Sequence, residues 1–566
     1  MKSNKLRKIC AVALTLALGM SVFAGCGNSS SGDSGRKLIY NLGEDPETLD
    51  PTLNTSSGAG SIIDNAFEGL MRLDENEKAI YGVAEKMEVS DDNLVYTFTL
   101  RKDAKWSDGQ VVTAKDFEYS WVRALTKETA SEYNYQLFYI KNGEKFYNGE
   151  DTREELGIEV VDDNTLKVTL EAPTAYFPEL TAFTTYMPLR EDIVSANPDG
   201  WANEPETYVS NGPFKLVQWD MKDQLIFEKN EEYWNAKEIK LPGLVWKLVT
   251  DQNTAYASLK SGEFDMVDTV PPAEIAKGQE EGLVTIYPNL ATYMLVMNVG
   301  KQSTLSEDVK KALSNEKVRK ALALSIDRKA ITENVTKSGQ VPAYSFVPKG
   351  ILNGNGEDFA DREYYDANKA NIDEAKKLLA EAGYPNGEGL PTLEFMYNTE
   401  GDHKLIAQAI QQDWAKIGVN VELTNQEWKV FLNTRQEGQY EIARHGWSGD
   451  YVDPMTFLDL WVTGGGNNDA GYSNAEYDKL VEAAKKEADQ DKRWEIMKQA
   501  EDILMSEMPI IPLYYYTKVK AAKPEVKGVR VSTLGHVFFD KAYIDEQYNF
   551  IKRRVLWLFF FNFQLY

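Results

Sequence analysis

The chain has 566 residues, enough for two or three globular domains, and its 43% hydrophobic content is sufficient for large cores. Its formal net charge of -26 repels phosphate backbones, which argues against a nucleic-acid partner. Its two cysteines, Cys10 and Cys26, both lie near the start, so the body is expected to have neither a disulfide nor a thiolate metal site. Three histidines without ligand-like spacing make zinc or haem improbable, and we predict no cofactor and no metal.

The first 26 residues have the pattern of an export signal. Basic residues in the first eight positions precede an apolar run over 9–20, which is too short to span a bilayer. Two small residues then precede Cys26, as in a bacterial lipoprotein signal, although Phe23 is an unusual residue at its position. We predict a signal peptide over 1–25 and lipidation of Cys26 on the outer face of the cell membrane. The alternative is an ordinary secretory signal with an incidental cysteine.

Strands and helices alternate after this segment. A Gly/Ser-rich tether over 26–35 precedes a strand expected at 38–40. Apolar and polar residues alternate over 94–100, which predicts a strand with one buried face. Thr113 and Asp116 have the spacing of a capping box, so a helix should begin there.

The same mixture continues to the end of the body. A further strand is expected at 166–170, and Asn371 and Gly383 should delimit a helix. A helix over 403–417 is expected to be followed by a strand over 419–423. A chain of this length with both elements throughout is predicted to be a multi-domain α/β protein.

The last residues, 547–566, form an atypical tail. Three basic residues at 552–554 precede seven apolar residues at 555–561, a run too short to cross a bilayer. A membrane-surface anchor is one interpretation. We favour an unstructured or aberrant extension, because the globular pattern ends near Tyr543.

Known catalytic motifs are missing from the sequence. It contains no HExxH zinc motif, no G-x-S-x-G elbow and no P-loop, and residues 446–449 have the wrong spacing for an elbow. The glycines at 464–466 are more typical of a mobile loop than of a phosphate cradle. This pattern favours binding over chemistry, and we predict that the chain is not an enzyme.

Several segments resemble the family 5 extracellular solute-binding proteins. The most specific are 100–109 and 112–121, which read LRKDAKWSDG and VTAKDFEYSW. The other matching segments, in chain order, are 211–214, 232–235, 374–384, 397–399, 425–428, 444–451 and 512–516. The resemblance extends over nearly the whole chain after the tether, and its last segments are most similar to oligopeptide-binding members.

The resemblance implies an architecture and a function. The fold would be α/β, a two-lobed periplasmic-binding-protein-like flytrap of type II with an extra third domain. Lobe I would comprise 36–57, 187–290 and 516–546, the extra domain 58–186, and lobe II 291–515. The protein would capture oligopeptides outside the cell as a monomer and deliver them to the permease subunits of an ABC transporter.

The resemblance also implies which residues hold the peptide. Asp450 would pair with the α-ammonium group, because an unpaired buried charge is costly. Gly446, Trp447 and Ser448 would pair with the peptide backbone as with an added strand. Other matching positions are the candidate partners of the peptide carboxylate, an acid for basic side chains and the cleft aromatics: Lys301, His403, Arg435 and Arg444; Glu44; and Tyr119, Trp428 and Tyr514.

The sequence departs from some relatives in ways that leave open how the peptide carboxylate is bound and which peptide length is preferred. A disulfide found in some of them would join positions 291 and 448, which here are alanine and serine. Val296 stands where some carry a cleft glutamate. A signalling or cell-wall peptide is an open alternative within the same fold. Nickel, haem or a sugar would be a different ligand of this fold, and the low histidine count disfavours nickel. A surface adhesin or chaperone is a further alternative, and a hydrolase is disfavoured by the motif search.

Overall fold

The computed structural model describes residues 35–301, 304–399 and 402–545. Internal contacts divide the chain into two units, Met1–Arg36 and Lys37–Tyr566, and the fold below concerns the second. The predicted signal peptide, Cys26, most of the tether and the tail over 547–566 lie outside the described residues. None of the helices in the described part of the chain combines the length and the hydropathy that a membrane-spanning helix needs.

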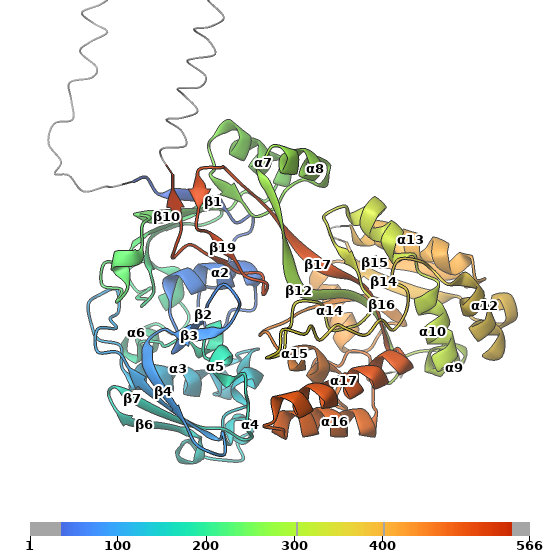
Figure 1. The fold of residues 1–566 in the computed structure, drawn as a ribbon, viewed down its shortest axis with the longest axis horizontal. Helices are drawn as coiled ribbons and strands as arrows, with labels where there is room; N and C mark the ends of the chain where they lie inside the picture. The colour runs from blue at the N-terminus through green and yellow to red at the C-terminus, as the bar shows by residue number, and fades with distance from the viewer. Residues whose placement is uncertain (1–34, 302–303, 400–401, 546–566) are drawn as a thin grey trace, which may run out of the picture. The chain divides into compact units, whose positions relative to one another are not determined.

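A large mixed sheet forms the framework of the body (Figure 1). In the part of the chain that the structure describes it has 11 strands, of which β13 (Val341–Pro342) pairs with β17 outside the main path. The main path, in order across the sheet, is β15 (Val421–Gln426), β14 (Leu393–Asn398), β16 (Ile442–Ser448), β12 (Val284–Met297), β17 (Ile510–Ala522), β11 (Met266–Val267), β1 (Leu38–Asn41), β10 (Gly243–Lys247), β9 (Gln224–Lys229) and β8 (Phe214–Asp220).

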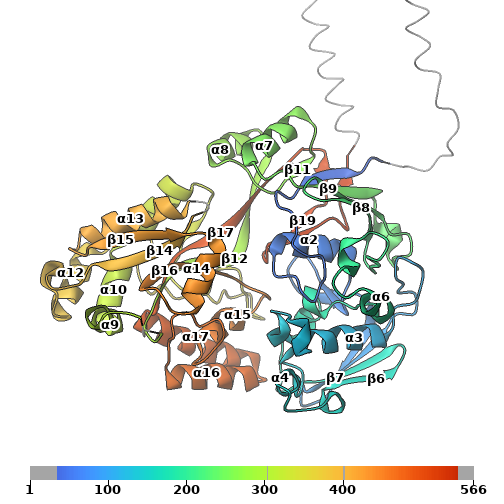
Figure 2. The ribbon, with the colours of Figure 1, turned by 180° about the vertical axis from the view of Figure 1, so that it is seen from behind.

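The two longest strands, β12 and β17, connect the two halves of this sheet. They pair antiparallel from Val284 opposite Ala521 to Val296 opposite Ile510. In Figures 1 and 2 they run from the side of α7 (Gln252–Ser261) and α8 (Pro272–Glu280) towards the other half. Their register shifts between Pro288 and Thr292 and again between Tyr293 and Met294. The lobe boundaries predicted at 290/291 and 515/516 fall inside these strands, close to the shifts.

A smaller antiparallel sheet lies within the segment predicted to be the extra domain. Its order is β4 (Ala84–Val89), β5 (Val95–Leu100), β7 (Thr165–Thr169) and β6 (Ile158–Asp162). Helix α3 (Ala114–Ala124) buries Phe117 and Trp121 completely. The capping box that predicted this helix is present, since the Thr113 N–H donates to the Asp116 carboxylate at 2.7 Å. The strands expected at 94–100 and 166–170 are confirmed within one residue at each end.

Residues that cap helices correctly predicted where other elements begin or end. Helix α12 (Ile372–Glu381) begins after Asn371, whose side chain accepts the Glu374 N–H. Helix α13 (His403–Ala415) is followed by Gly418, which adopts a φ of +83°. The strand expected at 419–423 exists as β15, but it begins and ends later. The type II periplasmic-binding fold expected from the sequence agrees with this architecture, whereas the exact domain boundaries stay predictions.

Other helices and short strands complete the body. Those of at least eight residues not yet given are α2 (Ser57–Ala66), α9 (Glu307–Ser314), α10 (Glu316–Leu324), α14 (Trp428–Gln436), α16 (Ala475–Lys486) and α17 (Gln490–Glu507). Two short hairpins matter for the site, β2 (Met71–Leu73) with β3 (Ala79–Tyr81) and β19 (Arg530–Val531) with β20 (Val537–Phe538).

One carboxylate of α17 is buried against the backbone of a distant loop. Glu501 is 1% exposed and accepts the N–H groups of Phe346 and Val347 at 3.1 and 2.8 Å. Burial is the main cause that raises the pKa of Glu501 from 4.5 to about 7. The folded chain therefore binds a proton at this position more tightly than the unfolded chain does.

The raised pKa predicts how stability depends on pH. The contribution of Glu501 to the free energy of unfolding is fully present below pH 4.5 and is lost as pH rises through 7. The loss is about 3 kcal/mol at most. Glu501→Gln keeps an acceptor for the two N–H groups but cannot ionise, so the variant should gain stability relative to wild type between pH 5 and pH 8. Urea unfolding followed by tryptophan fluorescence measures this difference. Glu495→Gln, on the exposed side of the same helix, should show no such gain, and an unchanged pH profile in Glu501→Gln would contradict the assignment.

Candidate functional site

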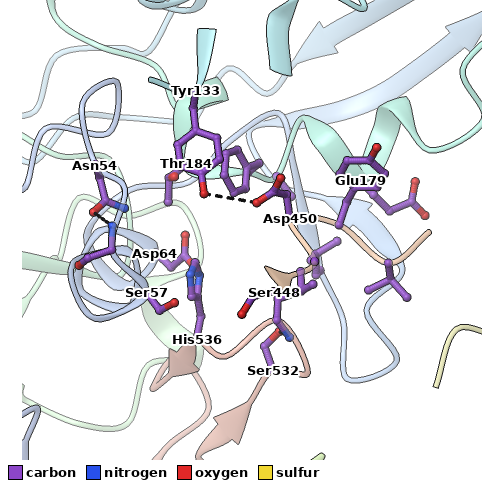
Figure 3. A pocket seen from close by; sticks show the side chains of 18 of the residues that line it. Asn54, Ser57, Asp64, Tyr133, Glu179, Thr184, Ser448, Asp450, Ser532 and His536 are labelled. Atoms are coloured by element: carbon purple, nitrogen blue, oxygen red, sulfur yellow. Dashed lines mark hydrogen bonds and ion pairs between the residues drawn. The ribbon is translucent and has the colours of Figure 1, made fainter. Parts of the chain in front are cut away.

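A cavity of about 590 Å³ lies among segments that are far apart in the sequence (Figure 3). Its walls come from α2, the β2–β3 hairpin, the segment around Tyr133, the end of β16, α14 and the β19–β20 hairpin. This volume is within the range of sites that bury most of a drug-sized ligand. The cavity is therefore large enough for a short peptide or a compound of similar size.

Asp450 projects into this cavity from the residues that follow β16. Its carboxylate accepts hydrogen bonds from Tyr133 Oη at 3.3 Å, Tyr135 Oη at 3.2 Å and Gln136 Nε2 at 2.9 Å. Its backbone N–H donates to Thr456 Oγ1 at 3.1 Å, which fixes the turn that carries it. Three neutral donors thus orient a carboxylate that faces an open space (Figure 3).

The charge of Asp450 has no protein counter-ion within 4 Å among the described residues. Burial, followed by repulsion from Asp459, raises the pKa of Asp450 to about 7, and the hydrogen bonds from Tyr135, Tyr133 and Gln136 oppose that rise. A half-buried carboxylate in this state is strongly stabilised by an incoming cation. The site is consequently suited to an ammonium group.

The end of β16 offers a free strand edge beside Asp450. On one side, Gly446, Trp447 and Ser448 pair with β12 opposite Tyr293, Thr292 and Ala291. On the other side, β14 pairs with β16 only at Ile442 and Ala443, and no described strand pairs with β16 beyond them. The backbone from 444 to 448 can therefore accept an additional strand at this edge.

His445 contributes to this edge in a single tautomer. Burial, with the nearby Arg435 charge, lowers the pKa of His445 to about 4, so the ring is neutral near pH 7. Its Nδ1 accepts the Gly446 N–H at 2.8 Å, and its Nε2 lies 3.3 Å from the Asp469 carboxylate. A ligand strand that bonds to Gly446 N–H would have to replace His445 as its acceptor.

Two buried arginines, Arg435 and Arg444, are predicted partners of the peptide carboxylate. Arg435 lines the cavity, but its Nε already donates to Asp469 at 2.6 Å. Arg444 does not line it, because its guanidinium lies 5.1 Å from the centre of the Trp428 ring and 5.6 Å from that of Phe431. Its Nε donates to Asn398 Oδ1 at 2.7 Å, and no described carboxylate lies within 4 Å of it. Trp428 lines the cavity and is 39% exposed.

The structure brings half of the predicted site residues to the cavity. Those lining it are Gly446, Trp447, Ser448, Asp450, Trp428 and Arg435. Those outside its walls are Arg444, His403, Lys301, Tyr514, Glu44 and Tyr119.

Four of the residues outside the walls occupy three other places. His403 Nδ1 lies 3.1 Å from Tyr293 Oη, and the Tyr293 ring stacks on Tyr514 at 4.7 Å. Lys301 Nζ donates to the Gln436 carbonyl at 3.2 Å. The pKa of Glu44 is raised, chiefly by burial and then by the Asp268 charge.

Tyr119 lies on α3, away from the cavity. Its hydroxyl is 3.4 Å from Ser195 Oγ. Tyr119 is not among the residues that line the cavity, and its role as a cleft aromatic stays a prediction.

Sequence reasoning missed several residues of the cavity. Tyr133, Tyr135 and Gln136 reach Asp450 from more than 300 positions away, and Asp64 meets His536 across 472 positions. Neither local periodicity nor a short motif relates such positions. The only signal was composition, since the stretch around Tyr133 is rich in tyrosine.

Comparison with known proteins agrees with this fold. The model of the family described as bacterial extracellular solute-binding proteins, family 5 Middle, matches residues 78–469. The oligopeptide-binding protein OppA of Bacillus subtilis is 38% identical over 542 residues, covering 94% of this chain and 97% of that protein. The dipeptide-binding protein DppE of the same organism is 35% identical, with coverages of 94% and 98%.

A solved structure shows the same similarity in three dimensions. Listeria monocytogenes OppA bound to peptide has a TM-score of 0.77 at 32% sequence identity, covering 91% of this chain and 100% of that one. The agreement over whole chains means that the similarity is not confined to one domain.

The environment of Asp450 leads to a prediction for the free protein. Tyr135→Phe removes a hydrogen bond that lowers the pKa of Asp450, so that pKa should rise further above 7. Titration of the aspartate carboxyl carbons by NMR, assigned with Asp450→Asn, measures the change. Tyr119→Phe is the matched control and should leave the titration unaltered. A lower or unchanged pKa in Tyr135→Phe would mean that the tyrosine does not stabilise the carboxylate.

Proposed function

Because the chain belongs to the family 5 bacterial extracellular solute-binding proteins, we propose that it captures oligopeptides outside the cell and delivers them to an ABC transporter permease. The observation that supports this most directly is the Asp450 carboxylate, which faces a cavity beside a free strand edge and has no described counter-ion. The relatives named for oligopeptides and dipeptides support the same ligand class.

The α-ammonium group of the peptide binds Asp450 in this proposal. A peptide of any sequence has an amino end, so a carboxylate that recognises it does not restrict the side chains. Tyr133, Tyr135 and Gln136 hold the carboxylate in position before the ligand arrives. Such preorganisation reduces the entropy that binding would otherwise cost.

The peptide backbone adds to the free edge of β16. Backbone N–H and C=O groups are the second constant feature of every peptide, and pairing with a strand satisfies them without reading the side chains. Gly446 and Ser448 lie at this edge, while Trp447 lines the cavity with an indole Nε1 that has no described acceptor.

The carboxylate end of the peptide binds Arg444, which requires Trp428 to move aside. Arg435 lines the cavity, but its neighbour Asp469 would repel a second carboxylate. Arg444 has an amide and aromatic rings as neighbours, and a ligand carboxylate would give its buried charge a full partner. Lys301 and His403 stay alternatives for peptides of other lengths.

The remaining parts of the proposal come from the sequence. The chain is exported by the signal over 1–25, lipidated at Cys26 and held as a monomer on the outer face of the bacterial cell membrane. It acts by binding and release rather than by catalysis, with no cofactor.

The ligand class can be tested by identifying what the protein carries. The chain without residues 1–25 is purified from cells, denatured, and the released compounds are analysed by mass spectrometry. A heterogeneous set of short peptides is the expected result. A single glycan, a metal alone or a small organic compound in stoichiometric amount would reject peptide capture.

The role of Asp450 can be tested by a double-mutant cycle on protein and ligand. Asp450→Asn should weaken binding of a free-amino peptide by about 2 kcal/mol or more, measured by calorimetry, because the ammonium loses its counter-charge. N-acetylation of the peptide should weaken binding to the wild type by a similar amount. It should cause little further loss in Asp450→Asn, since each change removes the same interaction. Additive losses would exclude a direct contact between the two groups.

A further inference from the structure

The cavity carries more negative charge than its ion pairs can balance. Ten carboxylates line it, against four arginine and lysine side chains. Each of the four cations is paired: Arg72 with Asp540, Arg435 with Asp469, Arg530 with Glu77 and Lys541 with Glu75. Among the described residues, Asp74, Glu132, Glu179 and Asp450 have no cation within 4 Å. One ligand ammonium at Asp450 would leave a clear excess of negative charge.

A histidine–aspartate pair is built into the cavity wall. His536, between β19 and β20, places Nδ1 2.6 Å from Asp64 Oδ2 on α2. A carboxylate can only accept, so Nδ1 carries the hydrogen and Nε2 offers a lone pair while the ring is neutral. Both residues line the cavity, and the Asp64 side chain is only 7% exposed.

The surrounding backbone holds this pair in place. Gly60 lies one helical turn before Asp64, and a Cβ at position 60 would be 2.8 Å from His536 Nε2. The hairpin that carries His536 is bonded to α2 by Asn65, which donates to the Val537 carbonyl at 2.7 Å and accepts the Phe539 N–H at 2.9 Å. The ring is therefore oriented before any ligand binds, as a binding site requires.

A buried hydroxyl completes this part of the wall. Thr184 is 2% exposed and lines the cavity, and its hydroxyl has no hydrogen-bond partner among the described residues. Figure 3 shows Thr184, Asp64 and His536 bordering the space that Asp450 and Ser448 border from another side. A side chain extending from the first residue of a peptide held at Asp450 would meet these groups.

We infer that Asp64, His536 and Thr184 form a subsite that selects peptides with a basic first residue, lysine or arginine. This inference rests on the proposed function, because it takes Asp450 as the partner of the α-ammonium. The second cation donates to His536 Nε2 and to the Thr184 hydroxyl, and it lies near the Asp64 charge. The excess carboxylates of the cavity favour the same cation through longer-range attraction.

Calorimetry with tripeptides tests the subsite in the chain without residues 1–25. Lys-Ala-Ala should bind at least about tenfold more tightly than norleucine-Ala-Ala, which has nearly the same shape without the charge. Ala-Ala-Lys should not share this advantage. Asp64→Asn keeps an acceptor for the His536 ring but removes the charge. It should therefore reduce, several-fold, the ratio of the affinity for Lys-Ala-Ala to the affinity for norleucine-Ala-Ala. Thr184→Val should reduce it as well.

Controls separate the subsite from the general field and from the proposed function. Glu75→Gln removes another carboxylate of the same cavity, one that is paired with Lys541, and should leave the ratio unchanged. Equal affinity for the lysine and norleucine peptides would overturn the subsite while peptide capture stands. Tighter binding of Glu-Ala-Ala than of Lys-Ala-Ala would overturn it, because the subsite would then attract an anion. Failure of every peptide to bind would reject the proposed function and the subsite with it.

Discussion

The pairing of β12 with β17 is the constraint on which the rest of the body depends. Strands β16, β14 and β15 join the sheet through β12, and β11, β1, β10, β9 and β8 join it through β17. A change in the angle between the two halves must therefore pass through this ladder. The ladder is irregular between Pro288 and Thr292 and after Tyr293, where missing bonds allow local bending and twisting. Hinge closure around a ligand would concentrate at these residues.

The same region explains why the site lies where it does. The free edge of β16 begins where its pairing with β14 ends, next to the irregular part of β12, so the sheet itself leaves backbone groups available. Beyond that edge the chain turns at Asp450 and reaches Tyr451, whose ring stacks on Tyr176 at 4.7 Å. The following Asp453 forms two 2.7 Å bonds with Arg493, which lies over Tyr176. Asp450 is thus held between a rigid contact and an open cavity.

Sequence reasoning succeeded where the determining interactions are local. The box at Thr113 and the cap at Asn371 are encoded within three residues, so both helices could be predicted to begin where they do. Asp450 and the Gly446–Ser448 segment came from family resemblance rather than from any local pattern. The covering of Arg444 by Trp428, and the pair that Asp469 makes with Arg435, depend on packing between α14 and β16. The hydrophobic periodicity of a sequence does not show whether a basic residue already forms an ion pair in the folded protein.

The raised pKa of Asp450 in the free protein links ligand binding to the release of a proton. Its pKa of about 7 means that part of the population carries a proton there at neutral pH. A ligand ammonium favours the charged form and lowers that pKa, so binding releases a proton from the population that held one. In the proposed role of Asp450 the charged form is the one that binds the ammonium group, and this form becomes scarcer as pH falls below 7. Burial of the carboxylate thus has two effects in this proposal. It strengthens the interaction with a cation, and it makes peptide binding weaker at acidic pH.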